Sequence, residues 1–325
     1  MAYHSRGHRK CAARTSLHQT ITNRIIAELK SGSVPWVQPW ANSVAPLGMP
    51  FNIVSGRKYS GINVLTLWNA AVSRGFSGQG FLTFRQARAL GGAVRRGEQG
   101  TDIIYTRRVA TRDERARAEG EGREPVASVP FLRHFTVFGA DQCDGLPFKF
   151  TVSTPALDSL LIVPAAEALI RATGADFRVG GAHAFYSPIH DFVQVPRPAS
   201  FFELVDWHRT AFHELSHWTG HPSRLARNHA GAFGSEAYAR EELVAELSGA
   251  FLCAELGIVP KVRHSDYIGA WLALLREDNR AVLRAASAAS RAADYILAFH
   301  PAASTTQRRQ CREVSRYSPM ERAVS

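Results

Sequence analysis

The 325-residue sequence predicts an α+β fold of two domains. Segments with apolar residues at helical spacing alternate with short stretches rich in β-branched and aromatic residues, which is typical of mixed helix and sheet. A hydrophobic content of 45% is enough for a substantial core. The charge is uneven, because residues 1–150 hold 21 Lys and Arg against 10 Asp and Glu, whereas residues 151–325 hold 18 of each. The first half therefore carries the whole net charge of +11, which suggests a polyanionic partner.

The first domain is predicted over residues 16–150, after a disordered basic tail at 1–15. A helix is expected from Ser16, because apolar residues recur at helical spacing as far as Leu29 and Gly32 can end it. The VPWVQPW stretch is then expected to be extended, because proline fixes the backbone. The remaining expected elements are a helix over 61–72, a strand and short helix over 81–92, and strands at 101–109 and 132–140, separated by a charged, mobile excursion over 111–128.

The second domain is predicted over residues 151–300, before a flexible tail at 301–325. Its apolar residues recur mainly at helical spacing, and a turn at Ser187–Pro188 is expected to separate two short strands. Gly257 is expected to end one of the helices. The expected elements are helices over 156–174, 201–221, 236–257, 265–278 and 281–299, with the two strands inside 177–196.

Several protein classes are excluded by the sequence. No apolar run reaches the roughly 20 residues that cross a bilayer, and the N-terminus lacks the apolar stretch of a secretory signal. The four cysteines lie far apart and form no CxxC pair, which argues against a disulfide scaffold. We therefore expect a cytoplasmic globular protein with no membrane partner.

The strongest chemical motif is His213-Glu214-Leu215-Ser216-His217, an HExxH pattern inside a predicted helix. Histidines four residues apart lie on one helix face, about 6 Å apart at Cβ, so both imidazoles can bind one metal ion. Glu214 stands beside them and is expected to act as the general base that takes a proton from metal-bound water. The cofactor is expected to be a divalent metal, Zn²⁺ first, with Mn²⁺ or Co²⁺ as alternatives.

A third metal ligand is expected from a later helix. A metzincin would need a histidine where Ser223 stands, so a glutamate in a gluzincin-like arrangement is favoured. Glu242 and Glu246 lie one turn apart on a face predicted to be buried, whereas Glu241 points away from it. Because unpaired buried charge is costly, we expect Glu242 to bind the metal and Glu246 to accept a hydrogen bond from a ligating histidine. The reverse assignment of these two glutamates remains open.

Two flanking segments are expected to border the cleft. Tyr186 and Asp191 lie in AFYSPIHDFVQVP, which can supply an edge strand that pairs with an extended substrate. Tyr186 is a candidate oxyanion donor, with a packed core tyrosine as the alternative. Beyond the HExxH helix, His221, Arg224 and Arg227 are expected to cap the helix end structurally, with substrate contacts as the alternative.

The first domain interleaves aromatic rings with cations, the combination that holds single-stranded nucleic acid. Trp68 and Phe84 stand among apolar neighbours and are expected to be buried. Rings in Pro/Gly-rich segments are better placed to stack on bases. The candidate DNA-binding residues are Trp36, Trp40, Arg57, Lys58, Tyr59, Arg95 and Arg96. The alternative is an ordinary basic surface over an aromatic core.

HELSHWTGHPSRLAR followed by YAREELVAELSGAFLCAELGI resembles the metallopeptidase-like domain of the ArdC antirestriction family. PWVQPW, PFNIVSGRKYSGINVLTLW, FLTFRQARALGGAVRRGEQGT and FTVFGADQ resemble that family's N-terminal domain, which also begins TraC-type plasmid primases. The resemblance implies a single-stranded-DNA-binding domain, a zincin-like domain, carriage on plasmids or other mobile elements, and protection of incoming DNA from host restriction. The chain departs from the family pattern at Gly139, where the family tends to have asparagine, and in the insert at 111–128.

Three functions compete at this stage. The first is a DNA-binding antirestriction protein with a working metallopeptidase that cleaves a host protein. The second is a DNA-binding protein whose metal site is only structural, although a structural site has no need of Glu214. The third is a metalloprotease or effector that acts independently of DNA. The sequence leaves open the protein substrate, the oligomeric state, and whether the two domains touch.

Overall fold

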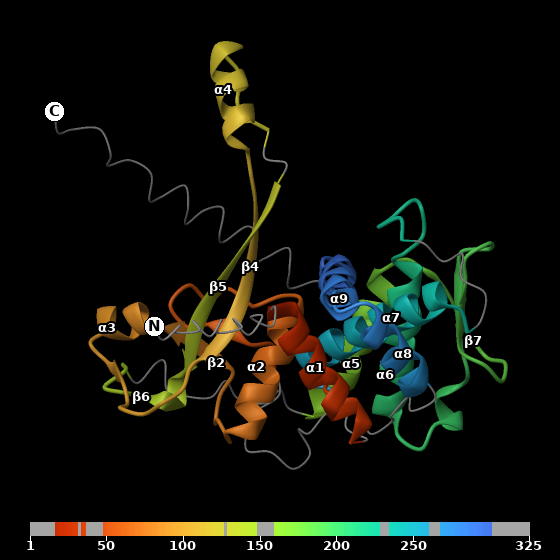
Figure 1. The fold of residues 1–325 in the computed structure, drawn as a ribbon. Coiled ribbons are helices and arrows are strands. Elements are labelled where there is room, and N and C mark those ends of the chain that lie inside the picture. Colours follow the sequence, from red (N-terminus) through yellow and green to blue (C-terminus); the bar gives the residue numbers. More distant parts are fainter. Residues whose placement is uncertain are drawn as a thin grey trace, which may run out of the picture.

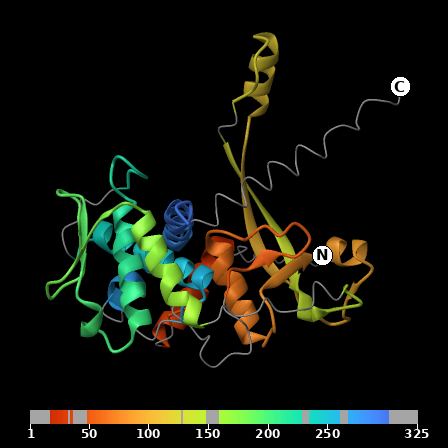
Figure 2. The same cartoon turned by 180° about the vertical axis from the view of Figure 1, so that it is seen from behind.

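The computed structural model describes residues 17–31, 34–36, 48–126, 129–147, 159–227, 234–259 and 267–300. Helices and strands alternate as expected for an α+β protein (Figures 1 and 2). The elements are α1 (Leu17–Lys30), β1 (Phe51–Asn52), α2 (Ile62–Ser73), β2 (Gly80–Thr83), α3 (Phe84–Ala89), β3 (Ala93–Val94), β4 (Thr101–Val109), α4 (Arg112–Gly120), β5 (Val129–Gly139), β6 (Cys143–Asp144), α5 (Ser159–Ala172), β7 (Asp176–Val179), β8 (Phe185–Ser187), β9 (Phe192–Val195), α6 (Leu204–Trp218), α7 (Glu236–Leu256), α8 (Ile268–Glu277) and α9 (Ala281–Leu297). Among the described residues, no helix combines the length and the apolarity needed to span a membrane.

The N-terminal half is built on a sheet with strand order β1-β2-β5-β4. Strands β4 and β5 pair antiparallel along the whole of β4 and extend far beyond the other strands. Together they rise from the body as a two-stranded arm that carries α4 at its tip (Figure 1). The predicted strands at 101–109 and 132–140 are therefore confirmed.

Helix α4 lies where the sequence predicted only a charged excursion. The Thr111 side chain caps it by accepting a hydrogen bond from the backbone N–H of Glu114 at 3.1 Å. The prediction missed this helix because 111–128 has no apolar face, and Ala118 is its one buried helical residue. Capping and helix-forming residues, rather than tertiary packing, specify α4.

The C-terminal half packs helices against a small sheet with strand order β7-β9-β8. The predicted turn near Ser187 does separate two strands, β8 and β9, and β7 adds a third that pairs parallel to β9. Helices α6 and α7 lie at the centre and are buried on almost every side. Gly257 ends α7 in the left-handed conformation (φ 71°), as the sequence predicted.

One apolar core joins the two halves. It extends from α1 and α2 in the N-terminal half to α7, α8 and α9 in the C-terminal half. Within it, the rings of Trp68 and Phe251 meet edge to face with centroids 5.7 Å apart. Polar contacts reinforce the junction, since the backbone N–H of Gly61 donates to Ser290 Oγ at 2.8 Å. The two predicted domains thus touch over a shared hydrophobic interior.

Candidate metal centre

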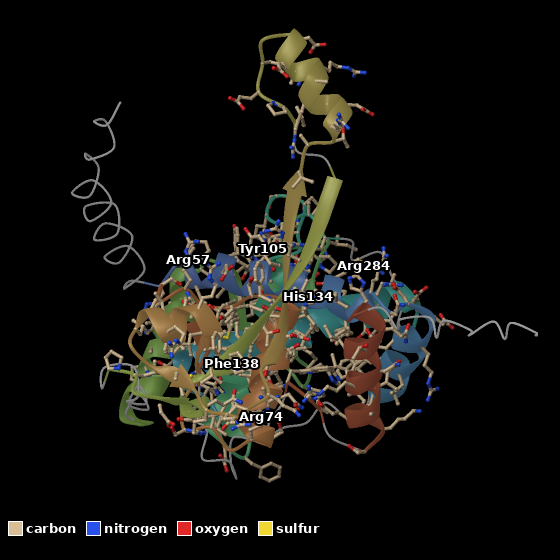
Figure 3. The ribbon with its side chains drawn as sticks, turned by 60° about the vertical axis from the view of Figure 1, so that its left-hand side comes forward. Arg57, Arg74, Tyr105, His134, Phe138 and Arg284 are labelled. Carbon is tan, nitrogen blue, oxygen red and sulfur yellow. The ribbon has the colours of Figure 1, made fainter. Side chains whose placement is uncertain are left out.

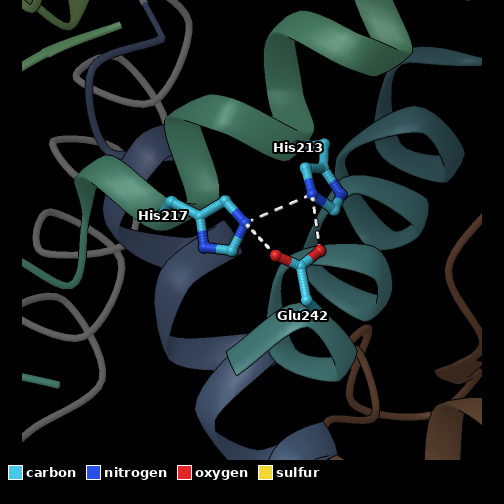
Figure 4. A group of neighbouring side chains, drawn as sticks. All are labelled: His213, His217 and Glu242. Carbon is cyan, nitrogen blue, oxygen red and sulfur yellow. Dashed lines mark hydrogen bonds and ion pairs between the residues drawn. The ribbon is translucent and has the colours of Figure 1, made fainter. Parts of the chain in front are cut away.

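Helices α6 and α7 bring three potential ligands together at their crossing (Figure 4). His213 and His217 lie one turn apart on α6, and their Nε2 atoms are 3.2 Å from each other. Glu242 reaches in from α7, with carboxylate oxygens 3.4 Å from His213 Nε2 and 3.5 Å from His217 Nε2. One ligand atom of each side chain lies within 4.8 Å of those of the other two. The three side chains predicted to bind metal therefore converge on one point.

A carboxylate backs each histidine on its other ring nitrogen. His213 Nδ1 lies 3.3 Å from Glu246 Oε1, and Glu246 accepts a 2.6 Å hydrogen bond from Arg209 Nη2. This is the place that the sequence predicted for Glu246. Such carboxylates hold Nδ1 protonated and direct the Nε2 lone pair toward a metal.

Glu241 occupies the equivalent place beside the second histidine, which corrects the prediction that it points away from the site. Its Oε1 lies 3.3 Å from His217 Nδ1, and Arg227 donates to the same carboxylate at 2.8 Å. Adjacent side chains on a helix point about 100° apart. Glu241 therefore contacts His217 of α6 from a different direction than Glu242 does. The sequence could not show how α6 crosses α7 and therefore missed this contact. Arg227 also donates to the Ser216 carbonyl and the Thr219 hydroxyl, contacts that agree with the structural role expected for it.

The cluster of acids gives the site a strong preference for positive charge. Burial alone would lower the pKa of His213, but Glu242 and Glu246 raise it to about 10. Burial would raise the pKa of Glu241, but His217 and Arg227 hold it at about 2. The pKa of Glu242 is likewise held below its ordinary value by the two histidines, against the effect of burial. Two imidazole nitrogens and one ionised carboxylate form a donor set that fits a divalent metal such as zinc or manganese.

The three side chains line a cavity of about 270 Å³. Glu214 lines the same cavity and is buried beside the histidines, with 7% of its surface exposed. Phe185 and Tyr186 of β8 also line the cavity. β8 is an edge strand of the three-stranded sheet β7-β9-β8, and edge strands have unpaired backbone groups on one side.

Tyr186 and Asp191 are tied into a structural network. The Tyr186 hydroxyl donates to Asp191 Oδ1 at 2.9 Å, and Arg224 Nη1 donates to Asp191 Oδ2 at 2.9 Å. Tyr186 lines the cavity, whereas Asp191 does not. This network fastens the β8–β9 turn to the end of α6, which is the structural role expected for Arg224. The Tyr186 hydroxyl thus has two polar partners in this network, Asp191 and Arg224.

Sequence reasoning missed two tyrosines of the cavity. Tyr238 and Tyr267 line it, and their hydroxyl oxygens are 3.2 Å apart. Tyr238 stands one helical turn before Glu242, which is the one local signal for its position. Tyr267 comes from the segment before α8, and nothing local indicates that it reaches the site.

Trp36 does not fit the prediction that it stacks on a DNA base. It is 2% exposed, and its ring packs edge to face on Trp271 with centroids 5.4 Å apart. A ring buried in the shared core cannot face a base. Trp40 lies outside the described residues.

Two of the predicted phosphate-binding cations already have acidic partners. Lys58 forms an ion pair with Glu255 of α7. Arg95 lies 2.7 Å from a Glu98 carboxylate oxygen and 3.6 Å from one of Asp144. Any phosphate at these positions would compete with a carboxylate of the protein.

The remaining candidates lie at the surface of the N-terminal half. Arg57 and Arg96 are exposed, and Tyr59 is partly buried against Phe81. The sequence prediction overlooked two exposed rings on the arm, Tyr105 and Phe135.

Each half of the chain matches a known protein family. Residues 15–138 match the family model for the N-terminal domain of anti-restriction factor ArdC, and residues 164–288 match that for a zincin-like metallopeptidase. An uncharacterized protein y4eC of Sinorhizobium fredii is 35% identical over 300 residues, covering 92% of this chain and 96% of that protein. DNA primase TraC of Escherichia coli is 36% identical over 297 residues, but the match spans 87% of this chain and 27% of the primase.

Two solved structures of the antirestriction ArdC protein from plasmid R388 share 35% sequence identity with the chain. The metal-free form has a TM-score of 0.73 and covers 88% of this chain and 98% of its own. The Mn(II)-bound form has a TM-score of 0.72 with coverages of 88% and 99%, which supports a divalent metal in this fold. The chain belongs to the ArdC family of antirestriction proteins, and its C-terminal half is a zincin-like metallopeptidase domain.

Proposed function

We propose that this protein binds a divalent metal at His213, His217 and Glu242, and that it hydrolyses peptide bonds there. The observation that carries the proposal is the convergence of these three side chains in a cavity that also holds Glu214. Zn²⁺ is the metal we expect first, with Mn²⁺ or Co²⁺ as alternatives, because the donor set suits all three. A host protein is the proposed substrate.

The residues around the cavity can perform the steps that peptide hydrolysis needs. A divalent metal bound there supplies Lewis acidity, which lowers the pKa of a water molecule and polarises a carbonyl group. The Glu214 carboxylate accepts the proton of the attacking water and delivers it to the leaving amine. The free edge of β8 can bind the substrate backbone as an added strand and so orient the scissile bond.

We also propose that the N-terminal half binds single-stranded DNA and that the protein protects a mobile element from restriction during conjugation. The supporting observation is the confinement of the net charge of +11 to residues 1–150. Cations along the phosphates and rings under the bases are what single-strand binding requires. In gel shifts with full-length protein we expect single strands to bind more tightly than duplex, with an affinity that falls as salt rises.

Peptidase activity is tested with metal-loaded protein and fluorescently labelled casein. Glu214→Gln should keep its metal, measured by titration, and lose about 10²- to 10⁴-fold in cleavage rate, because the proton acceptor is gone. Glu277→Gln, at an exposed position on α8, is the matched control and should cleave normally. Metal binding without cleavage by the unmodified protein would favour a structural metal site. Cleavage without any single-strand binding would favour a DNA-independent protease.

A further inference from the structure

We infer that the arm formed by β4 and β5 is the surface on which single-stranded DNA stacks its bases, with Tyr105 and Phe135 as the stacking rings. This inference rests on the proposed DNA binding and adds the place and mode of contact. It replaces Trp36, which is buried.

The pairing register puts the two rings on one face of the arm. Ile103 pairs with Phe135, and Tyr105 pairs with Arg133. Residues directly opposite each other in an antiparallel pair share a face, as do residues two apart along a strand. Ile103, Tyr105, Arg133 and Phe135 therefore form one contiguous face.

This face changes from core to surface along the arm. At its inner end, Ile103 and Val137 are 8% and 1% exposed and pack in a cluster with α2 and β2. Further out, Tyr105 is 55% exposed and Phe135 is 42% exposed. Their ring centroids are 6.5 Å apart, and neither ring belongs to an apolar cluster of the described residues. The two rings therefore present aromatic surface to solvent, on which unpaired bases can stack.

The chemistry around the rings favours a nucleic acid. Arg133 is exposed directly opposite Tyr105, so a cation stands beside the aromatic pair. Figure 3 shows Tyr105 and His134 where the arm leaves the body, with Arg57 to one side and Arg284 to the other. Tyr59 is partly buried and packs on the same inner cluster as Ile103. Unpaired bases present both faces for stacking, whereas a duplex hides them, so this surface selects single strands.

The test measures binding of a short fluorescent oligo-dT strand to the full-length protein by anisotropy. Tyr105→Leu and Phe135→Leu should each weaken binding about 5- to 100-fold, while Tyr105→Phe should keep the affinity. Arg133→Gln should reduce the dependence of log affinity on log salt by about 0.7. Phe84→Leu removes a ring that is 53% exposed elsewhere in the same half, and it should bind as the unmodified protein does.

The outcomes separate this inference from the proposed function. Tight oligo-dT binding that survives both leucine variants would overturn the stacking surface and leave DNA binding intact. Equal loss in Phe84→Leu would also overturn it, because the effect would not belong to the arm. Failure of the unmodified protein to bind oligo-dT would overturn both. Because both rings are exposed, thermal unfolding of the leucine variants should match that of the unmodified protein.

Discussion

The metal centre and the stacking face of the arm differ in how their side chains are held. At the metal centre, both histidines contact a carboxylate, and both of those carboxylates accept a hydrogen bond from an arginine. On the arm, Tyr105 and Phe135 stand in solvent and contact each other. Buried polar groups need partners, so the fold fixes the first site before any ligand arrives. The second site is specified by what it leaves exposed.

The largest effect of the difference between the buried metal centre and the exposed arm is expected for Glu246→Gln. Glu246 is the buried carboxylate that contacts His213. Glu246 and Arg209 are 0% and 2% exposed at their side chains, so the substitution removes the carboxylate that balances a buried guanidinium. We expect it to lower the free energy of unfolding of metal-free protein by about 3–5 kcal/mol in urea titrations. Glu167→Gln removes an exposed partner of Arg171 and should cost less than about 0.5 kcal/mol. A similarly small loss of unfolding free energy in both variants would show that burial of the ion pair does not determine its contribution to stability.

Trp36 and Tyr105 allow the same contrast to be drawn between two aromatic residues. Trp36→Ala removes a core ring and should lower the free energy of unfolding by about 3–5 kcal/mol. The oligo-dT affinity of the molecules that remain folded should not change. Tyr105→Leu should do the opposite, with full stability and weaker DNA binding. Loss of DNA affinity in folded Trp36→Ala would restore the role that the sequence suggested for this ring.

Glu241→Gln tests whether the outer carboxylates serve the metal. Without this charge, the tautomer of His217 that carries its proton on Nδ1 and leaves Nε2 available to the metal is less stabilised. Metal affinity should therefore fall about 10- to 100-fold. Competition with a chromophoric chelator would measure it, and Glu236→Gln, an exposed acid on the same helix, is the control. An unchanged metal affinity would show that Glu241 pairs with Arg227 without assisting metal binding.

The smallest effect concerns the Asp191–Arg224 contact at the rim. The hydrogen bonds from Arg224 hold the pKa of Asp191 below its ordinary value of 3.8. Because the pKa of Asp191 is lower in the folded than in the unfolded protein, the contact stabilises the fold fully at pH values above the unfolded-state pKa. This stabilisation is lost as the pH falls through the folded-state pKa. Asp191 is about one-third exposed, so the contribution should be about 0.2–1 kcal/mol. Unfolding measured from neutral pH down through this acid range should show a shallower loss of stability in Asp191→Asn.

The parts predictable from sequence were those specified by local spacing. The HExxH turn and the one-turn spacing of Glu242 and Glu246 fix relative positions on a helix, whatever the rest of the chain does. Gly257 marked a helix end for an equally local reason, because its backbone is left-handed.

The misses depended on contacts between distant segments. Trp36 is buried because Trp271 lies beside it, and no local pattern links the two. Phe84 has apolar neighbours in sequence, yet it begins α3 at the surface and is 53% exposed. The exposure of Tyr105 and Phe135 depends on where α2 stops covering the β4–β5 face, which is a property of the assembled fold.

The packing of α1 against α8 has a consequence for how the chain folds as it is made. The Thr22 hydroxyl donates to the carbonyl of Asn279, 257 residues later. At about 5–20 residues per second, Thr22 is synthesised roughly 13–50 s before that partner. During this interval the apolar side of α1, including Ile25 and Leu29, lacks the surface that finally covers it. The last helices to be translated therefore complete the burial of the first. If translation stops before α8 is made, the apolar side of α1 stays exposed and can be bound by chaperones.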